Sequence, residues 1–311
     1  MRLIRGVYNL PQFPQGTAVT IGAFDGIHLG HQAIIEQVVE RAKQLALPSV
    51  LICFEPLPRE YFAQDNAPLR ILSFRDKYRV MQELGIDVVL LINFNHRVAS
   101  LSAEEFFEQV FLQGLNMRYL VVGDDFRFGS NRGGDKKMFQ DYSKIYEFGF
   151  SQASSVTHEG DRVSSTLIRE CIASGEFQRV SALLGRPYCI SGQLVAEKSP
   201  QQNRTSEHFS ILCYTLLNDV HLVRITLANR QQCYAVIEPE SCVDQSVINH
   251  RRLFSARLLE DVDVLPKQPI TIEFLFRMPE NQGQAVRHNR SERLQDNVSR
   301  ARQWLAESRL I

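Results

Sequence analysis

The chain has 311 residues, a length that fits one large domain or two ordinary ones. Lysine plus arginine equal aspartate plus glutamate, at 35 each, so no overall charge draws the protein to nucleic acid or to a membrane surface. No segment has the length and apolarity of a signal peptide or a transmembrane helix, and the six scattered cysteines include no C-x-x-C pair. We expect a cytoplasmic protein with reduced thiols and without nucleic-acid or membrane partners.

The first half of the chain alternates between apolar runs and helical patterns. Residues 1–16 are expected to form an edge strand or arm, and residues 18–21 a buried strand that leads through glycines into a helix. Further strands are predicted at 49–54, 87–92 and 118–123, and further helices at 74–84 and at 102–111, where Ser102 and Glu105 form a capping-box pattern. Strands that alternate with helices of this length predict a parallel, doubly wound α/β sheet.

The turn after the first buried strand reads I-G-A-F-D-G-I-H-L-G-H from Ile21 to His31. A strand that passes through glycines into a helix presents free backbone N–H groups and the positive end of the helix dipole, which suit a phosphate. His28 and His31 lie three residues apart, so both rings can face one ligand and stabilise charge on a phosphoryl group. A lone His-x-x-His pair is more often surface decoration or half of a metal site, but the glycines, the strand and Asp25 favour phosphate chemistry.

Three later stretches carry further candidates. The prolines that follow strand 49–54 force an extended loop at the strand end where open α/β sheets place ligands. Residues 121–135 form a polar, glycine-rich loop, for which a plain surface turn is an equally good interpretation on spacing alone. In S-S-T-L-I-R, Ser164 or Ser165 caps a helix and Arg169 lies one turn later, so hydroxyls, N–H groups and a guanidinium form a second anionic pocket. Taken in isolation, that pattern favours an ordinary capped helix.

The second half of the chain changes its period. A short amphipathic helix is expected to end at Gly185, because Pro187 prevents its continuation. Apolar runs in strand-like alternation follow at 190–195, 210–217, 221–227, 233–237, 253–259 and 270–276, and a helix near 293–308. This pattern predicts a small antiparallel barrel or sandwich. We therefore expect two domains, residues 1–185 and 186–311.

The motifs of the first half resemble a known family. Gly22-x-Phe24-Asp25-Gly26-x-His28-x-Gly30-His31 resembles the HxGH motif of nucleotidyltransferases, and S-S-T-x-I-R resembles the second nucleotide motif of the FMN adenylyltransferase module in bacterial bifunctional riboflavin kinase/FAD synthetases. The resemblance implies a Rossmann-like nucleotidyltransferase domain followed by a riboflavin-kinase-like β-barrel with a C-terminal helix. It implies the reaction of FMN with ATP to give FAD and pyrophosphate, with Mg²⁺ as cofactor.

The resemblance also implies roles for individual residues. His28 and His31 would be catalytic, stabilising the charge at the α-phosphorus of ATP. The residues implied to bind ATP are Gly22, Phe24, Asp25, Gly30, Ser165, Thr166 and Arg169. The residues implied to bind the flavin are Phe54, Pro56, Asp125, Phe126 and Phe128. No side chain is predicted to ligate a metal.

Three departures from the family pattern bear on function. Leu57 stands where the family has a histidine on the flavin side, which makes the acceptor less secure than the use of ATP. The kinase loop G-R-x-x-G-F-P-T-A-N is replaced by the residues from Glu197 to Ser206, and the kinase strand E-V-H-L-L-D by those from Ser255 to Glu260. We expect a lost kinase activity. A non-enzymatic flavin or nucleotide sensor, and an adenylyltransferase for another phosphorylated acceptor, remain as alternatives.

Overall fold

The computed structural model describes residues 1–195, 208–239 apart from 216 and 218, 251–262 apart from 261, 267–278 and 290–308. The chain divides into two compact units, which are described one at a time. The first unit holds residues 1–69 and 77–165, and the second holds residues 70–76 and 166–311. No helix among the described residues combines the length and the apolar character needed to cross a bilayer.

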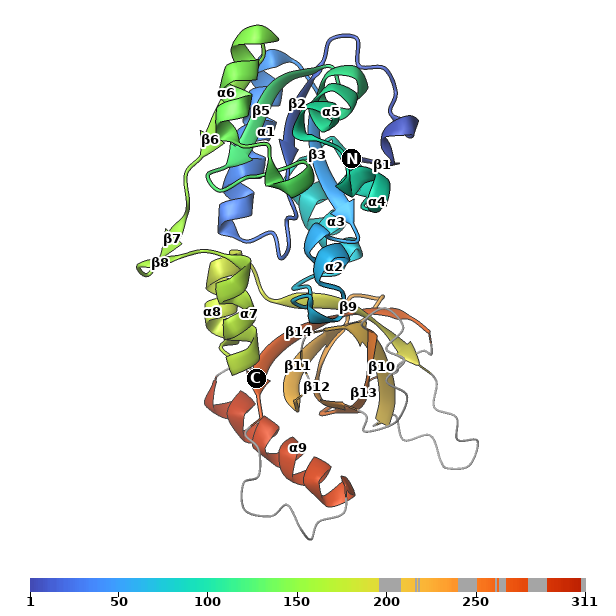
Figure 1. The fold of residues 1–311 in the computed structure, drawn as a ribbon. Coiled ribbons are helices and arrows are strands. Elements are labelled where there is room, and N and C mark those ends of the chain that lie inside the picture. The colour runs from blue at the N-terminus through green and yellow to red at the C-terminus, as the bar shows by residue number, and fades with distance from the viewer. Residues whose placement is uncertain are drawn as a thin grey trace. The chain divides into compact units, whose positions relative to one another are not determined.

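The first unit is built on a six-stranded parallel sheet in the order β1-β4-β3-β2-β5-β6 (Figure 1). Its strands are β1 (Arg2–Arg5), β2 (Thr17–Ile21), β3 (Ser49–Glu55), β4 (Val88–Asn93), β5 (Met117–Gly123) and β6 (Gly149–Ala153). Its longer helices are α1 (Leu29–Leu45), α3 (Phe74–Glu83), which begins in residues of the second unit, and α6 (Lys136–Ile145). Shorter segments are η1 (Val7–Asn9), α2 (Pro58–Ala63), η2 (Gln64–Asn66), α4 (His96–Ala99), α5 (Ala103–Phe106), η3 (Phe107–Gly114) and η4 (Ser130–Arg132), with the two-stranded pair β7 (Thr157–His158) and β8 (Asp161–Arg162). The predicted parallel α/β sheet is confirmed.

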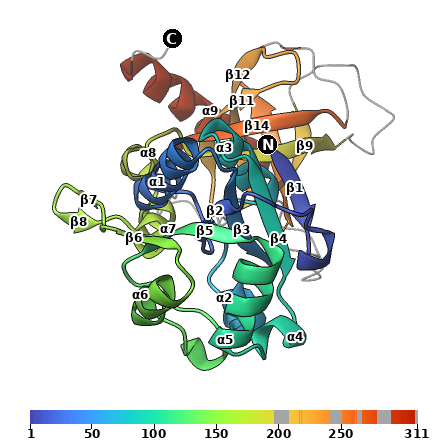
Figure 2. The ribbon, with the colours of Figure 1, turned by 90° about the horizontal axis from the view of Figure 1, so that it is seen from above.

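The centre of the sheet is buried on both faces because helices lie on both sides of it (Figure 2). Every residue of β2 is buried. Successive side chains of a strand point to opposite faces, so Val19 and Ile21 enter a core that also contains Phe107, Phe111 and Phe139. Helix α1 buries the apolar face that its sequence predicts, with Ile35, Val38, Val39 and Ala42. The sheet thus gives the turn between β2 and α1 a rigid support.

Helix α5 begins with the capping box that the sequence indicates. The side chain of Ser102 accepts a hydrogen bond from the N–H of Glu105 at 3.1 Å, and the N–H of Ser102 donates to the Glu105 carboxylate at 2.8 Å. The predicted single helix 102–111 is longer and less regular than expected, because α5 passes into the π-helical segment η3. That segment buries Phe107 and Phe111 on one side, where they meet the aromatic core.

The second unit is a closed antiparallel barrel in the strand order β10-β13-β12-β11-β14-β9, preceded by two helices and followed by one. Its elements are α7 (Ser165–Ser174), α8 (Phe177–Leu184), β9 (Cys189–Val195), β10 (His208–Tyr214), β11 (His221–Thr226), β12 (Gln232–Pro239), β13 (Arg251–Leu258), β14 (Pro269–Arg277) and α9 (Arg290–Glu307). Helix α8 ends at Gly185, which takes the left-handed conformation with φ 66°. The prediction of a small β-barrel with a C-terminal helix is confirmed.

Residues 70–76 group with the barrel although they come from the first half of the sequence. Ile71 and Leu72 are buried, and the hydroxyl of Tyr188 donates to the carbonyl of Ile71 at 3.3 Å. The backbone N–H and the hydroxyl of Ser191 in β9 both donate to the carboxylate of Asp76. Helices α7 and α8 also belong to this unit, so the compact units divide the chain elsewhere than at residue 185. A fragment boundary at that residue stays a prediction.

Candidate active site

The turn between β2 and α1 holds two residues in a backbone conformation that residues other than glycine rarely adopt. Phe24 has φ 47° and Ile27 has φ 43°, and Gly26 between them has φ 83°. A left-handed conformation costs a bulky or β-branched residue energy, and it persists where the surroundings enforce it. Here both side chains are buried, with exposed fractions of 1% and 0%. The turn is therefore held in one strained shape by the packing of its own residues.

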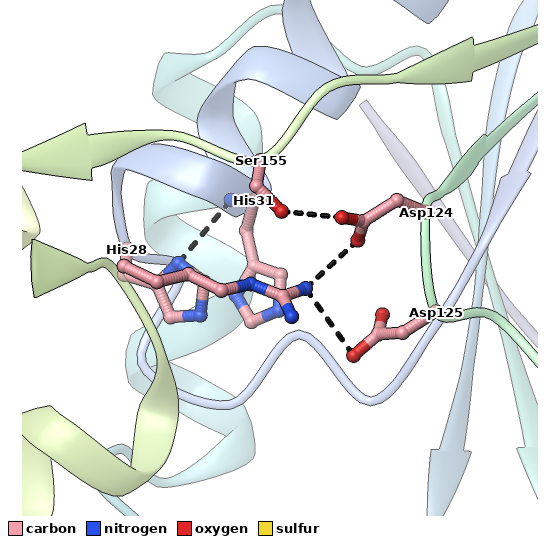
Figure 3. Close-up of polar contacts among 6 residues, drawn as sticks. His28, His31, Asp124, Asp125 and Ser155 are labelled. Atoms are coloured by element: carbon pink, nitrogen blue, oxygen red, sulfur yellow. Dashed lines mark hydrogen bonds and ion pairs between the residues drawn. The ribbon is translucent and has the colours of Figure 1, made fainter.

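The two histidines of the turn lie side by side (Figure 3). His28 is the N-cap of α1, and its Nδ1 accepts a hydrogen bond from the backbone N–H of His31 at 3.4 Å. The two rings stack, with centroids 3.7 Å apart and planes 19° from parallel. The edge of the Phe24 ring meets His31, with the centroids 5.3 Å apart. Because Nδ1 of His28 acts as an acceptor, the ring in this arrangement carries its proton at Nε2, from which it can donate to a ligand.

Gly30 allows this close packing of the histidines. A Cβ atom placed on Gly30 would lie 3.3 Å from Cε1 and Nδ1 of the His28 ring and 3.8 Å from the carbonyl oxygen of Val163. The first distance is tighter than most Cβ contacts in proteins, so a larger residue would shift the His28 ring by a few tenths of an ångström. The second shows that the chain before the S-S-T motif also approaches this turn. Gly30 thus leaves room for the close approach of its neighbours.

The second motif reaches the turn through Ser165. Its hydroxyl donates to the backbone carbonyl of Asp25 at 3.0 Å, and Asp25 itself is buried. Ser165 begins α7, as the cap pattern predicts, and Thr166 and Arg169 follow in the first turns of that helix, in the second unit. One member of the second motif therefore contacts the first motif directly. The roles of Thr166 and Arg169 as ATP ligands stay predictions.

Asp125 lies beside two charged residues that the sequence interpretation did not single out, Asp124 and Arg162 (Figure 3). The guanidinium of Arg162, at the end of β8, lies 2.8 Å from a carboxylate oxygen of Asp124 and 3.4 Å from one of Asp125. The hydroxyl of Ser155 donates to the other oxygen of Asp124. These contacts tie the β7–β8 hairpin to the end of β5. Arg162 comes two residues before Ser164 in the sequence, and this closeness to the S-S-T motif was the signal that could have found it.

The aromatic residues assigned to the flavin lie in two clusters of rings. Phe126 and Phe128 stack, with centroids 5.8 Å apart, and Phe128 stacks on Phe139 at 4.7 Å. Phe128 is buried, so most of its surface packs in the core. The interpretation of this loop as a surface turn did not predict that burial. Phe54 meets Phe94 edge to face at 5.5 Å, and Phe106 lies between the two clusters, 6.4 Å from Phe54 and 6.1 Å from Phe128.

The cluster that contains Phe54 and Phe94 extends to an exposed ring that sequence analysis missed. Phe94 contacts both Tyr61 and Phe62 of α2, with centroids 5.3 and 5.7 Å away. Phe62 is 67% exposed, which is unusual for a large apolar side chain. Pro56 and the buried Leu57 precede this helix. The proximity of a Y-F pair to the proline loop was the signal that could have found it.

In the described part of the chain, no group of three or more histidine, cysteine, aspartate or glutamate side chains is arranged to hold a metal ion. Cys53 in β3 is fully buried, and burial raises the pKa of its thiol to about 12. A thiol with such a pKa is neither a nucleophile nor a metal ligand at neutral pH. The polar groups near the turn include the two histidines and the charged residues around Asp124.

Comparisons with known proteins identify the family to which the chain is similar. Residues 10–167 match the family model described as FAD synthetase. The bifunctional riboflavin kinase/FMN adenylyltransferases of Escherichia coli K12 and Haemophilus influenzae are each 41% identical to the chain, over 196 and 195 residues. Both alignments cover 63% of this chain and 63% of the relative, so the chain spans less than two thirds of these relatives.

Two further comparisons cover more of the chain. The enzyme of the same description from Buchnera aphidicola of Acyrthosiphon pisum is 32% identical over 228 residues, which cover 72% of this chain and 73% of the relative. A crystal structure described as a macrolide-efflux protein from Streptococcus pneumoniae covers 97% of both chains with a TM-score of 0.75. At 23% identity, that likeness shows a shared fold. The family model and the Buchnera relative establish that the chain belongs to the FAD synthetase family.

Proposed function

We propose that the protein is an FMN adenylyltransferase that converts FMN and MgATP to FAD and pyrophosphate. The observation that carries the proposal is the stacked pair of His28 and His31 on a strained turn at the N-terminus of a helix. Ring N–H groups, backbone N–H groups and the helix dipole there all favour negative charge. Membership of the FAD synthetase family supports the same activity.

The reaction needs positioning and charge stabilisation rather than a covalent intermediate. A phosphate oxygen of FMN attacks the α-phosphorus of ATP in line, a new P–O bond forms, and the bond to pyrophosphate breaks with its electron pair on the leaving group. His28 and His31 stabilise the charge that develops on the α-phosphoryl oxygens. Thr166 and Arg169 hold the departing pyrophosphate, and Ser165 fixes the carbonyl of Asp25 beside the turn. The magnesium ion enters with ATP, whose phosphates are its main ligands.

The exposed end of the aromatic cluster supports a site for the flavin ring. A flat, largely apolar ring system packs well against aromatic faces and edges. Phe62 offers such a surface, and Phe94, Tyr61 and Phe54 hold it in place. Leu57 lies at the start of the same helix and is buried, so it adds apolar contact and no hydrogen-bond donor from its side chain. We assign the flavin to this cluster, with Asp125 and Phe126 as further proposed contacts.

We further propose that the barrel has lost riboflavin kinase activity. The support is in the sequence: the stretch from Glu197 to Ser206 lacks the glycines and the P-T-A-N of the kinase loop, and it lies outside the described residues. The stretch from Ser255 to Glu260 begins in β13 and lacks the glutamate with which the family strand starts. Small-molecule substrates and a cytoplasmic location remain part of this proposal.

Release of pyrophosphate tests the proposed function and its alternatives together. Purified protein is incubated with MgATP and, in separate reactions, with FMN, with riboflavin, with other phosphorylated acceptors, or alone. We expect pyrophosphate only with FMN, in amounts equal to the FAD formed. Release with a different phosphate ester would identify another acceptor. No release with any acceptor, together with measurable flavin or ATP binding, would support the sensor and contradict the proposal.

A further inference from the structure

A lysine that the proposed mechanism does not use lies directly beneath the glycine turn. The side chain of Lys77 in α3 is fully buried, and its ammonium donates a hydrogen bond to the backbone carbonyl of Ala23 at 3.3 Å. Ala23 is the second residue of the turn, between Gly22 and the strained Phe24. Both residues belong to the first unit. The contact therefore joins α3 to the segment on which the histidines are built.

This ammonium lacks the compensation that buried lysines usually have. Lysine is almost never fully buried unless it is paired, because removing a charge from water is costly. Among the described residues, the hydrogen bond of the Lys77 ammonium goes to a backbone carbonyl. The adjacent carboxylate of Asp76 accepts hydrogen bonds from Ser73 and Ser191 instead. A buried positive charge whose hydrogen-bond partner is a carbonyl is favourable only if another interaction compensates the cost of its burial.

Lys77 lies near the fully buried Cys53 of β3. Burial raises the pKa of the Cys53 thiol, the Lys77 ammonium opposes that rise, and the Glu55 carboxylate adds to it. In such a desolvated place a charge acts over several ångströms far more strongly than at the surface. The turn above it is the segment where anionic groups are expected to bind. The free protein thus carries a buried positive charge behind an anion-binding turn.

The geometry of the peptide bond gives the Ala23 contact a second effect. In a trans peptide the carbonyl and the following N–H point in opposite directions. Lys77 draws the carbonyl of Ala23 toward the buried side of the turn, so the N–H of Phe24 points toward the opposite side. Ala23 itself is exposed, so the start of the turn lies at the surface, whereas Phe24 is buried. A carbonyl held toward Lys77 would repel a phosphate at this surface less than a carbonyl that pointed outward.

We propose that Lys77 is a positioning residue for nucleotide binding, which holds the Ala23 carbonyl inward and places a buried positive charge behind the turn that receives the triphosphate. The inference rests on the proposed function, because it takes ATP as the ligand of the turn. It adds a residue that lies outside both sequence motifs and on a different helix. It also explains why a costly buried ammonium is present: the anionic ligand supplies the missing counter-charge.

Substitution of Lys77 tests the inference with MgATP as the probe. In Lys77→Met the charge and the hydrogen bond are lost at similar volume, and in Lys77→Gln a neutral donor remains. We expect Lys77→Met to unfold at the same temperature as the wild type or higher, since an apolar residue replaces a poorly compensated charge. Its Kd for MgATP should rise roughly tenfold, with KM for ATP rising more than kcat falls. The Kd of Lys77→Gln for MgATP should lie between those of the wild type and Lys77→Met.

Lys43→Gln is the matched control, because Lys43 is an exposed lysine near the far end of α1. It removes the same formal charge and should leave the Kd within twofold. MgATP binding by Lys77→Met within twofold of the wild type would overturn the inference. So would a failure of both Lys77 variants to fold, since the lysine would then serve stability alone.

The failure of the proposed function gives a different result. Wild-type protein that binds MgATP but makes no FAD would refute the adenylyltransferase proposal and leave the role of Lys77 in binding intact. Wild-type protein that does not bind MgATP would overturn both.

Discussion

The glycine turn and the barrel differ in how their chemistry is related to their fold. In the turn, the residues with proposed chemical roles are also the residues that build it: His28 caps α1, Gly30 makes room for its ring, and Phe24 is held by burial. In the barrel, alternating apolar residues such as Ile211, Phe254 and Ile272 fill the interior, and none of them belongs to a kinase motif. A barrel can therefore lose its chemistry and keep its fold, whereas the turn cannot easily do so. The predictions that follow test this difference, beginning with the largest expected effect.

Replacement of His31 should affect the rate more than any other change considered. His31→Ala removes a donor that acts on the transition state, so kcat should fall about 10²–10³-fold. The melting temperature should change little, because the shape of the turn depends on His28, Gly30 and Phe24 rather than on His31. Stopped assays of FAD formation, with circular dichroism on the same samples, measure both quantities. His96→Ala, on the exposed helix α4, is the control and should retain full activity. A rate within twofold of wild type for His31→Ala would remove the histidine from the mechanism.

Removal of the barrel should affect stability rather than chemistry. A fragment ending at Gly185 keeps the turn and all of the parallel sheet but loses Tyr188 and Ser191, which hold residues 70–76. We expect it to fold and to keep its turnover at saturating substrates. It should be less stable by roughly 2–3 kcal/mol, because Ile71 and Leu72 lose part of their burial. Urea unfolding and FAD formation by the fragment and the full chain are compared. A folded but inactive fragment would show that the barrel completes the site.

A fragment that begins at Ser191 gives the reciprocal experiment. It retains β10 to β14, most of β9 and α9, and it should make neither FAD from FMN nor FMN from riboflavin. Kinase activity in this fragment would mean that the barrel holds metal and phosphate with residues that the family pattern does not identify.

Acid should destabilise the second unit through His221. This histidine is fully buried between Phe177 and Phe274, and burial, with a further contribution from Arg277, lowers its pKa to about 3. The unfolded chain has a histidine pKa near 6.5, so it binds a proton first as the pH falls. The stability from the neutral ring is complete above about pH 6.5 and is lost as the pH falls toward 3. Urea unfolding should show a loss of roughly 2 kcal/mol between pH 6.5 and 5 from this residue. The difference should be absent in His221→Leu, while His96→Ala should behave as the wild type.

The ion pairs of Arg162 should contribute the smallest effect on stability. The side chain of Arg162 is 53% exposed and that of Asp125 is 79% exposed, so water and salt screen their attraction. Arg162→Ala should lower the free energy of unfolding by less than about 1 kcal/mol. Chemical denaturation at low and at high salt measures the loss, which should shrink at high salt. A loss of several kcal/mol would show that the β7–β8 hairpin supports the whole unit.

Local signals in the sequence were strong where one physical rule dominates. The apolar face of α1, the capping box at Ser102 and Glu105, and the stop at Gly185 each follow from spacing or from a single backbone requirement. The parallel sheet followed from the alternation of strands with helices, and the barrel from the change to a period of two. These features could be predicted because neighbours in the sequence decide them.

Contacts between distant segments could not be predicted in the same way. Lys77 looks like an ordinary helical lysine in the sequence, and its burial depends on a carbonyl 54 positions earlier. Arg162 and Asp124 are 38 positions apart, and Phe62 becomes a candidate only when Phe94 is seen beside it. Residues 70–76 join the barrel through Ser191, more than a hundred positions later. Such pairs depend on tertiary packing, which a periodic pattern does not encode.

Offering FMN and riboflavin side by side to one preparation of the full chain tests the central claim most directly. Each flavin is incubated with the same concentration of MgATP, and the flavin products and the adenine nucleotides are separated and quantified. We expect FAD and pyrophosphate from FMN, and neither FMN nor ADP from riboflavin. FMN and ADP formed from riboflavin would contradict the proposed loss of kinase activity in the barrel, and the absence of FAD from FMN would contradict the role proposed for the glycine turn.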